Sequence, residues 1–376
     1  MSLALQQAIL AFTVTLALIW LLARIAPRLG LMDAPNHRKK HAGQVPLVGG
    51  IAIFLTLMLC AWIWKEVGLH SVGTQVNALK MFMVAGGALV LLGVLDDRFQ
   101  LSVFTRTAFE VGIAMLLIEG LNLRLTELGD LVGTGHIELK SWIAYPFTVV
   151  CIFGVINAYN MLDGMDGLLG IVMLTTLIAF HLFTGIEPGI LTIVIGSSLA
   201  AFLISNLGVA PFIPKSFLGD AGSKLLGLLV VALVLTVTST QIGGDRLIDP
   251  VTALYLLGLP LFDMAFTTLR RILRGKSPVR SDNTHIHHLM RTLGLSERRS
   301  LVIIGTLGIS MPYLGLMLAR SGAAEAYQFY IFLGCFAGYC LIMSQAWFVA
   351  TRCRGNTVSR EPTTPITDTR QEAHEI

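Results

Sequence analysis

The stretch Asn157-Ala-Tyr-Asn160-Met-Leu-Asp163-Gly-Met-Asp166-Gly167 is a polar loop between two long apolar runs. It offers two carboxylates, two amides and glycines that let the backbone turn tightly. Carboxylate and amide oxygens are the hard ligands that magnesium prefers. The stretch therefore suits a metal-bound phosphate. The plainer alternative is a connector that needs its Asp and Gly residues only for turns and helix caps.

The composition around this loop is that of a membrane protein. Hydrophobic residues make up 54% of the 376 residues and charged residues 13%, against roughly 25% charged in an ordinary globular domain. We expect an all-α polytopic protein with one catalytic transmembrane domain over residues 1–350. The polar tail, residues 351–376, is expected to be cytoplasmic and disordered. The five cysteines form no CxxC pair and read as small core residues rather than metal ligands.

Eleven apolar runs predict eleven transmembrane helices, since a helix needs about 20 apolar residues to cross a bilayer. No basic residues precede the first run and no small-residue cleavage site follows it, so it is expected to be a span and not a signal peptide. Residues 123–139 alternate weakly around glycines and predict a small periplasmic hairpin. The runs cover residues 3–22, 50–64, 81–95, 103–118, 142–158, 168–183, 189–204, 225–238, 251–269, 301–318 and 329–350.

The basic residues predict the orientation of these spans. With the N-terminus periplasmic and the C-terminus cytoplasmic, the inner side carries 21 of the 27 Lys and Arg residues. The positive-inside rule favours this arrangement. It also puts four separate polar loops on the cytoplasmic side, which supports a shared site at that face.

Each of the other polar loops has a functional and a structural interpretation. Asp96 and Asp97 are adjacent, so on a helix they point about 100° apart and are expected to contact different groups. Alternatively, the pair only ends a span and balances Arg98. Asp220 opens a span in a Gly-Asp-Ala-Gly-Ser turn, where a helix cap and a metal ligand are equally good explanations.

The histidines at 285, 287 and 288 favour phosphate or nucleotide binding. Their spacing differs from that of helical zinc sites, no cysteine accompanies them, and five basic residues lie just upstream. Glu110 and Asp263 are acids within apolar runs, both toward the inner end. A proton-coupled transporter would more typically carry such groups near the membrane midplane, so transport is the weaker class of function.

Five motifs, in this order and spacing, resemble those of the polyprenyl-phosphate N-acetylhexosamine-1-phosphate transferases. The resemblance runs from about residue 30 to the end of the last span, and the tail after it departs from the family by being less basic. The motifs are residues 41–50, Leu-Asp-Asp-Arg at 95–98, residues 157–170, Phe-Leu-Gly-Asp-Ala-Gly-Ser at 217–223, and residues 270–289.

The resemblance implies a phosphoglycosyl transferase of the bacterial inner membrane, with its active site on the cytoplasmic face. It implies that N-acetylglucosamine 1-phosphate passes from UDP-N-acetylglucosamine to undecaprenyl phosphate, as the first membrane step of an O-antigen or common-antigen type of polysaccharide. Mg²⁺, or Mn²⁺, is the implied cofactor. The bilayer is a partner, a homodimer is one expected assembly, and no nucleic acid is expected.

One alternative within the family transfers phospho-N-acetylmuramoyl-pentapeptide. Its members show three consecutive histidines, whereas this chain has His-Ile-His-His, which matches the N-acetylglucosamine branch. A relative that uses another UDP-N-acetylhexosamine stays open, because the orientation of one hydroxyl depends on the shape of the pocket.

Family motifs also assign roles to residues. Near the lipid phosphate the resemblance places Asp96 and Asp97, and near the nucleotide sugar it places Arg271 with the histidines. It leaves the roles of Asp163 and Asp166 unsettled. The candidate catalytic residues are Asp96, Asp97, Asp163 and Asp166; the candidate substrate-binding residues are Lys40, His41, Asn157, Arg271, His285, His287 and His288; the candidate metal ligands are Asp220 and Asn160.

Overall fold

The computed structural model of the chain describes residues 2–33, 43–66, 73–239, 246–277 and 284–358. Over these residues the chain is mostly helical, with two pairs of very short strands. The elements are α1 (Leu3–Leu29), β1 (Met32–Asp33), β2 (Val45–Pro46), α2 (Gly49–Glu66), α3 (Gly73–Phe99), α4 (Val103–Leu121), β3 (Glu127–Gly129), β4 (Ile137–Glu138), α5 (Ser141–Leu162), α6 (Leu168–Thr184), α7 (Ile190–Asn206), α8 (Gly219–Thr238), α9 (Pro250–Leu256), α10 (Gly258–Leu273), α11 (Ile286–Thr292), α12 (Glu297–Arg320) and α13 (Glu325–Val358).

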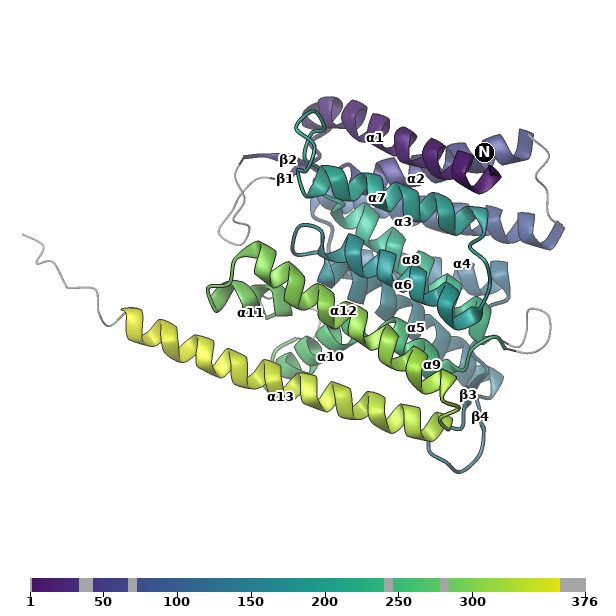
Figure 1. The fold of residues 1–376 in the computed structure, drawn as a ribbon, viewed down its shortest axis with the longest axis vertical. Coiled ribbons are helices and arrows are strands. Elements are labelled where there is room, and N and C mark those ends of the chain that lie inside the picture. The colour runs from purple at the N-terminus through teal and green to yellow at the C-terminus, as the bar shows by residue number, and fades with distance from the viewer. Residues whose placement is uncertain (1, 34–42, 67–72, 240–245, 278–283, 359–376) are drawn as a thin grey trace, which may run out of the picture.

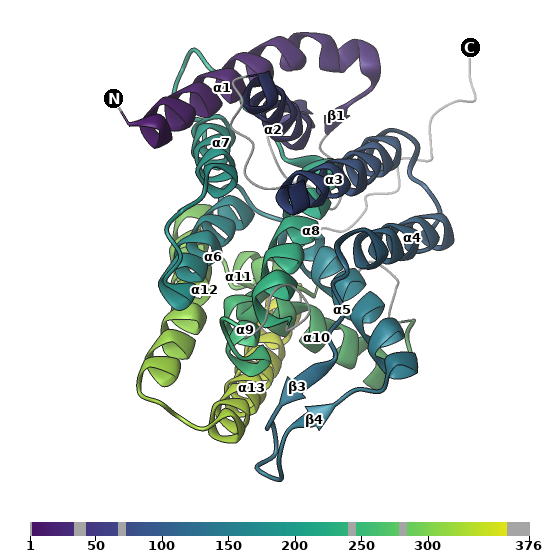
Figure 2. The same ribbon diagram turned by 90° about the vertical axis from the view of Figure 1, so that its right-hand side faces the viewer.

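The long helices lie roughly side by side and form a bundle around α8 (Figure 1). Figure 2 shows α8 near the middle of the bundle, with α3 and α5 beside it. It packs against α2, α3 and α5, and nearly all of its side chains are buried. A helix that is apolar on every side is expected at such a central position.

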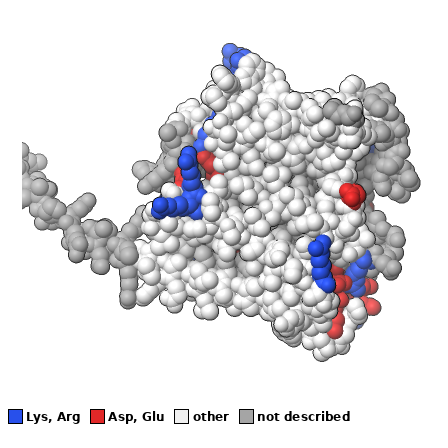
Figure 3. Space-filling view, viewed as in Figure 1, with Lys and Arg blue, Asp and Glu red and all other residues white. Residues whose placement is uncertain are grey.

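The surface and the helix lengths both fit a membrane protein. On the face seen in Figure 3, most charged side chains gather toward two ends and leave a broad uncharged band between them. Among the described residues, six helices are long and apolar enough to cross a membrane, or seven if the bent pair α9 and α10 counts as one span. The protein is therefore an all-α polytopic membrane protein.

All eleven predicted runs are helical, but they are less uniform than expected. Three of them form shorter apolar helices, α2, α6 and α7. The run at 251–269, predicted as one span, is not a single straight helix. It is broken into α9 and α10, which meet at an angle of 84°. Leu257 lies at the break with φ −101° and ψ 2°, and Gly258 and Pro260 follow it.

The predicted hairpin at 123–139 is confirmed as an antiparallel pair of strands, β3 and β4. It lies at the same end of the bundle as the N-terminus (Figure 1). The second pair, β1 and β2, was not predicted, because each strand is only two residues long. Helix α13 continues past residue 350 to Val358. The rest of the tail lies outside the described residues.

Small residues bring α8 very close to two neighbouring helices. A Cβ on Gly50 of α2 would overlap the backbone of Gly222, and a Cβ on Gly93 of α3 would overlap the backbone of Ala221. Close approach of helix backbones requires small residues at the contact. The Gly-Asp-Ala-Gly-Ser motif thus fixes α8 against α2 and α3, and holds the polar ends of α3 and α8 together.

Candidate functional site

The predicted site residues that the structure describes lie around one end of the bundle. This is the end where α3, α5 and α10 finish and α8 and α11 begin (Figure 1). Lys40 and His41 lie outside the described residues, so their predicted roles stay predictions.

The segment before α8 is held by the backbone. The amide of Gly49 donates to the carbonyl of Phe217 over 2.9 Å, and the amide of Gly50 donates to the carbonyl of Leu218 over 3.0 Å. Gly219 begins the helix with φ +72°, and its missing side chain leaves room for the carboxylate of Asp97. A residue with a Cβ would be strained there and would contact that carboxylate.

Asp220 does not cap α8. The capping position is Leu218, with no side-chain hydrogen bond, and Asp220 lies in the first turn. Its backbone amide instead donates to both carboxylate oxygens of Asp97, at 3.2 and 3.1 Å. Asp97 therefore receives an orphan N–H at a helix N-terminus, and the two acids lie side by side. The cap interpretation of Asp220 is wrong for this helix.

Asp96 takes part in a buried ionic network that also includes Asp220. The ammonium of Lys224, 1% exposed, lies 3.3 Å from an oxygen of Asp96 and 3.4 Å from one of Glu110. It also lies 3.3 Å from Asp220. On its outer side Asp96 binds Arg106 at 3.0 Å. Asp96 is thus occupied by two cations.

The polar loop that opens the sequence argument joins this network from α5. Asn157 donates to Glu110 over 2.7 Å. One turn later, the amide oxygen of Asn160 accepts the hydroxyl proton of Ser223, also over 2.7 Å. Asn160 is therefore positioned on the first turn of α8. Asn157, a candidate substrate ligand, is engaged in a contact inside the bundle.

The remainder of the loop turns back into α6. Asp163 ends α5, and Asp166 pairs with Lys215. The amide of Gly167 donates to the side-chain oxygen of Asn206 over 2.6 Å, and Gly167 has φ +76°. These contacts show that part of the loop does serve as a turn, and that Asp166 pairs with a lysine of the segment before α8.

The histidines form a second polar group on the other side of the loop. His285 and His287 are buried, and their rings lie parallel at 5.8 Å between centroids. The ring of His287 is 4.2 Å from that of His288. A Cβ on Gly164 would overlap the His287 ring, so the loop and the histidines are in direct contact. The loop therefore connects the carboxylates to the histidines.

His287 is a buried imidazole whose Nδ1 has no hydrogen-bond partner among the described residues. Burial holds its pKa well below the ordinary value, and the neighbouring His288, His285 and Arg291 add to this effect. A buried histidine without an anionic neighbour is expected to be neutral. Such a ring can exchange hydrogen bonds with a ligand at neutral pH.

Arg271 lies on the same face of α10 as Asp263 and Thr267, at four-residue spacing, and all three are buried. Thr267 and Asp263 both contact His285. Arg271 thus follows one turn beyond the histidine contact, and its predicted place beside the histidines stays a prediction.

The donors at the start of α8 fit a magnesium ion. Among the described residues, no group of three Asp, Glu, His or Cys side chains could hold a metal ion alone. Magnesium, however, commonly uses one or two carboxylates and completes its shell with water and substrate phosphates. Asp97 and Asp220, with the Asn160 amide nearby, offer such an incomplete oxygen set. Among the described residues, the three histidines do not form a group that could bind zinc.

Three residues of these networks were missed as site residues. Lys224 was not singled out, although it follows Asp220 by four residues and is a lone cation in an apolar helix, where a charge is costly. Glu110 and Asp263 were noticed as acids in apolar runs, but no partner could be named for either of them.

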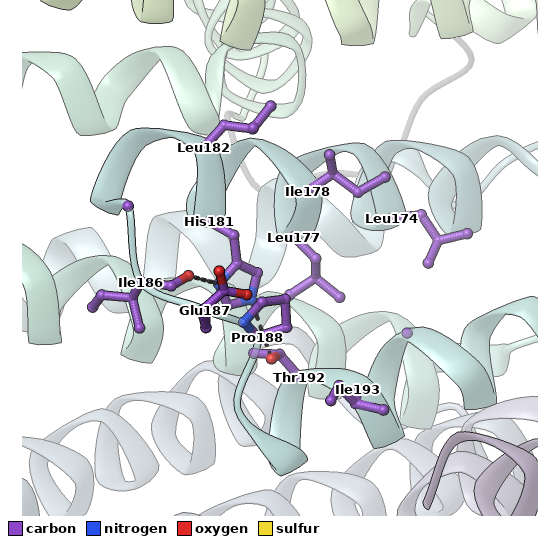
Figure 4. A pocket seen from close by; sticks show the side chains of 12 residues that line it. Leu174, Leu177, Ile178, His181, Leu182, Ile186, Glu187, Pro188, Thr192 and Ile193 are labelled. Carbon is purple, nitrogen blue, oxygen red and sulfur yellow. Dashed lines mark hydrogen bonds between the residues drawn. The ribbon is translucent and has the colours of Figure 1, made fainter. Parts of the chain in front are cut away.

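One hollow lies away from this site. A cavity of about 440 Å³ lies between the end of α6 and the start of α7. Figure 4 shows His181 in this cavity, hydrogen-bonded to the carbonyl of Ile186 and to Thr192. The other lining side chains are mainly apolar, and the cavity is at the opposite end of these helices from the carboxylates and histidines. It is not part of the candidate site.

Comparison with known proteins identifies the family of this chain. The family model described as glycosyl transferase family 4 matches residues 79–238, which include Asp96, Asp97, the 157–167 loop and Asp220. An undecaprenyl-phosphate alpha-N-acetylglucosaminyl 1-phosphate transferase of Yersinia pestis is 32% identical over 352 residues, 92% of each chain. Proteins of the same name from Salmonella typhi and Escherichia coli strain K12 are 33% and 31% identical, over 92% and 90% of this chain and 93% and 90% of theirs. These relatives confirm the resemblance drawn from the five motifs, and the chain belongs to glycosyl transferase family 4.

Proposed function

We propose that this protein transfers N-acetylglucosamine 1-phosphate from UDP-N-acetylglucosamine to undecaprenyl phosphate, with release of UMP. The observation that carries the proposal is the convergence of two polar groups at one end of an apolar bundle. Carboxylates at the start of α8 and histidines at the start of α11 flank the 157–167 loop. The names of the relatives supply the identity of the lipid and the sugar.

The reaction exchanges one phosphorus–oxygen bond for another. An oxygen of the lipid phosphate attacks the sugar-bearing phosphorus of the UDP-sugar. The bond from that phosphorus to the UMP oxygen breaks, and UMP leaves with the electron pair. The second pKa of a phosphate monoester is about 6, so the lipid phosphate is mostly dianionic at pH 7. The protein therefore has mainly to offset charge and align the reactants.

The contacts divide this work among the acids. Asp96 is engaged by both Lys224 and Arg106, while Asp220 shares only Lys224 with it in this network. We therefore assign Asp97 and Asp220 as the carboxylates for a metal ion, with Asn160 beside them. A bound Mg²⁺ or Mn²⁺ would neutralise phosphate charge there. Arg271 and the histidines would bind the diphosphate of the nucleotide sugar, since a guanidinium forks onto phosphate oxygens.

The membrane placement follows from the substrates. A lipid phosphate and a water-soluble UDP-sugar can meet only at a membrane surface. We propose the cytoplasmic face of the inner membrane, in a single domain of eleven spans with the N-terminus outside. The charge split between the two sides supports this orientation. A homodimer stays a prediction.

The decisive experiment uses the purified full-length chain with undecaprenyl phosphate and a panel of labelled UDP-sugars. We expect UMP release and labelled lipid with UDP-N-acetylglucosamine, and weaker turnover with its galacto epimer. Absence of labelled lipid with every UDP-sugar would contradict the proposed function.

A metal titration tests the assignment of Asp220. Asp220→Asn keeps the size of the side chain but removes its charge, so we expect activity to fall by about 100-fold or more, with partial recovery at high Mn²⁺. Asp130→Asn, in the β3–β4 hairpin at the opposite end, is the control and should keep wild-type activity. Wild-type activity of Asp220→Asn at limiting Mg²⁺ would remove Asp220 from the metal site.

A further inference from the structure

Asp263 is a buried carboxylate in α10, 1% exposed, with three hydrogen-bond partners outside its own helix. One oxygen is 2.8 Å from Nδ1 of His285. The other oxygen accepts the backbone amide of Ile286 and the hydroxyl of Tyr339, each over 2.9 Å. Donors from the α11 segment and from α13 thus meet on one carboxylate of α10.

This geometry fixes the proton on His285. An ionised carboxylate is only an acceptor, so Nδ1 of His285 must carry the proton that points at Asp263. The other nitrogen, Nε2, has no hydrogen-bond partner among the described residues and is left for a ligand. A carboxylate in this position holds the tautomer and orientation of an imidazole and stabilises the imidazolium when the other nitrogen donates.

The effect extends from His285 to the loop. The rings of His285 and His287 differ in orientation by 3°, and His287 rests on Gly164 of the 157–167 loop. Among the described residues, His287 Nδ1 is buried without a hydrogen-bond partner, so this stack contains an unsatisfied polar atom that a ligand could bind. Rotation of His285 would disturb both rings.

Helix α13 holds the same segment at a second point. The indole N–H of Trp347 donates to the carbonyl of Thr284 over 3.2 Å, and the guanidinium of Arg270 lies over the Trp347 ring at 4.8 Å. Tyr339 lies about two turns before Trp347 on α13. The last helix therefore contacts the histidine segment directly and also through Asp263.

We propose that Asp263 is a positioning residue for His285, and that Tyr339 of α13 holds Asp263 in place. Together they orient the histidine face that receives the diphosphate of the nucleotide sugar. This inference rests on the proposed function for the identity of the ligand, and it adds to that function an orienting role for the last helix.

The kinetic test compares Asp263→Asn and Tyr339→Phe with wild type, with each substrate varied in turn. Loss of a hydrogen bond to a charged group corresponds to about 10- to 100-fold in binding. We expect an increase of that size in KM for the UDP-sugar with Asp263→Asn, a severalfold increase with Tyr339→Phe, and an unchanged KM for the lipid. Tyr327→Phe, an exposed tyrosine of the same helix, is the matched control and should behave as wild type.

NMR of ¹⁵N-labelled histidine can identify the tautomer of His285 independently of enzyme activity. In protein labelled with ¹⁵N-histidine, Nδ1 of His285 should resonate as a protonated nitrogen in wild type. It should become unprotonated in Asp263→Asn, because the new amide donates to it. The signal is assigned by its disappearance in His285→Gln, and thermal unfolding of each variant is measured alongside.

The outcomes separate the two proposals. If wild type is inactive with every UDP-sugar, the proposed function fails. If wild type is active but both variants keep wild-type KM values, or raise both KM values equally, the positioning role fails. An unchanged Nδ1 signal in Asp263→Asn would overturn it as well. If Asp263→Asn does not fold, Tyr339→Phe against Tyr327→Phe decides.

Discussion

Lys224 illustrates how a single charge is accommodated inside an apolar bundle. Its ammonium is surrounded by carboxylates from three helices, and both Asp96 and Glu110 are themselves buried. Desolvating two charges costs several kcal/mol per ion, and only good geometry with further hydrogen bonds offsets that cost. Asn157 supplies one such bond to Glu110. The network thus depends on every member being present.

Removing Lys224 should therefore be costly. Lys224→Met leaves two buried carboxylates without their cation, and we expect a loss of roughly 3–5 kcal/mol in the free energy of unfolding. Lys215→Met is the control, because the Lys215 pair with Asp166 is partly exposed, and such pairs contribute about 0–1 kcal/mol. Thermal unfolding in one detergent measures both. Equal destabilisation by the two substitutions would mean that the buried network is not structurally important.

The lowered pKa of His287 leads to a prediction about how the stability of the folded protein depends on pH. Its folded-state pKa lies below the unfolded value, which is about 6.5, so the unfolded chain binds a proton more readily than the folded one. The folded state should lose stability as the pH falls below about 6.5, and should gain nothing from His287 above that pH. Between about pH 7.5 and pH 5, the melting temperature of His287→Asn should fall less than that of wild type. Thermal unfolding of both proteins in the same buffers measures this. A parallel decline in both proteins would contradict this.

At the level of elements, periodicity and hydropathy predict where helices lie but not how they meet. The run at 251–269 is apolar on average, so its mean hydropathy gives no sign of the bend between α9 and α10. Gly258 and Pro260 were the local signal, since proline is tolerated in the first turn of a helix but not in its interior. The bend matters for the site because it directs α10, with Asp263 and Arg271, toward the histidines.

The close contact between α3 and α8 leads to a prediction about stability and activity. Ala is favoured over Gly in a helix by roughly 1 kcal/mol, so Gly112→Ala, which meets open space on α4, should be neutral or stabilising. Gly93→Ala would push its Cβ into the backbone of Ala221, and overpacking costs about 1–3 kcal/mol. It should also separate Asp97 from Asp220 and lower activity. Unfolding and UMP-release assays on both variants test this, and equal behaviour would show that the helices can move apart freely.

At the level of the whole molecule, the sequence predicted the class of protein, the helical runs and the convergence of separate loops at one end. The composition, the order of the apolar runs and the distribution of charges were sufficient for these three predictions. It did not predict the pairing of Glu110 with Lys224, or of Asp263 with Tyr339. These contacts join residues far apart in the chain, and a single sequence does not indicate which side of an apolar helix faces which neighbour.

The last prediction concerns sidedness, because the substrates reach the site only from the proper face of the membrane. The β3–β4 hairpin and the N-terminus share one end of the bundle, and α11 and the end of α13 lie at the other (Figure 1). The predicted topology puts 21 of the 27 Lys and Arg residues on the side of α11, so that side should be cytoplasmic. Thr134→Cys in the hairpin should react with a membrane-impermeant maleimide in intact cells, whereas Arg299→Cys at the start of α12 should react only after permeabilisation. Both positions are exposed in the structure, and the parent chain with its native cysteines gives the background. Labelling of Arg299→Cys in intact cells would place the histidines outside, where cytosolic UDP-sugar could not reach them, and would contradict the proposed site.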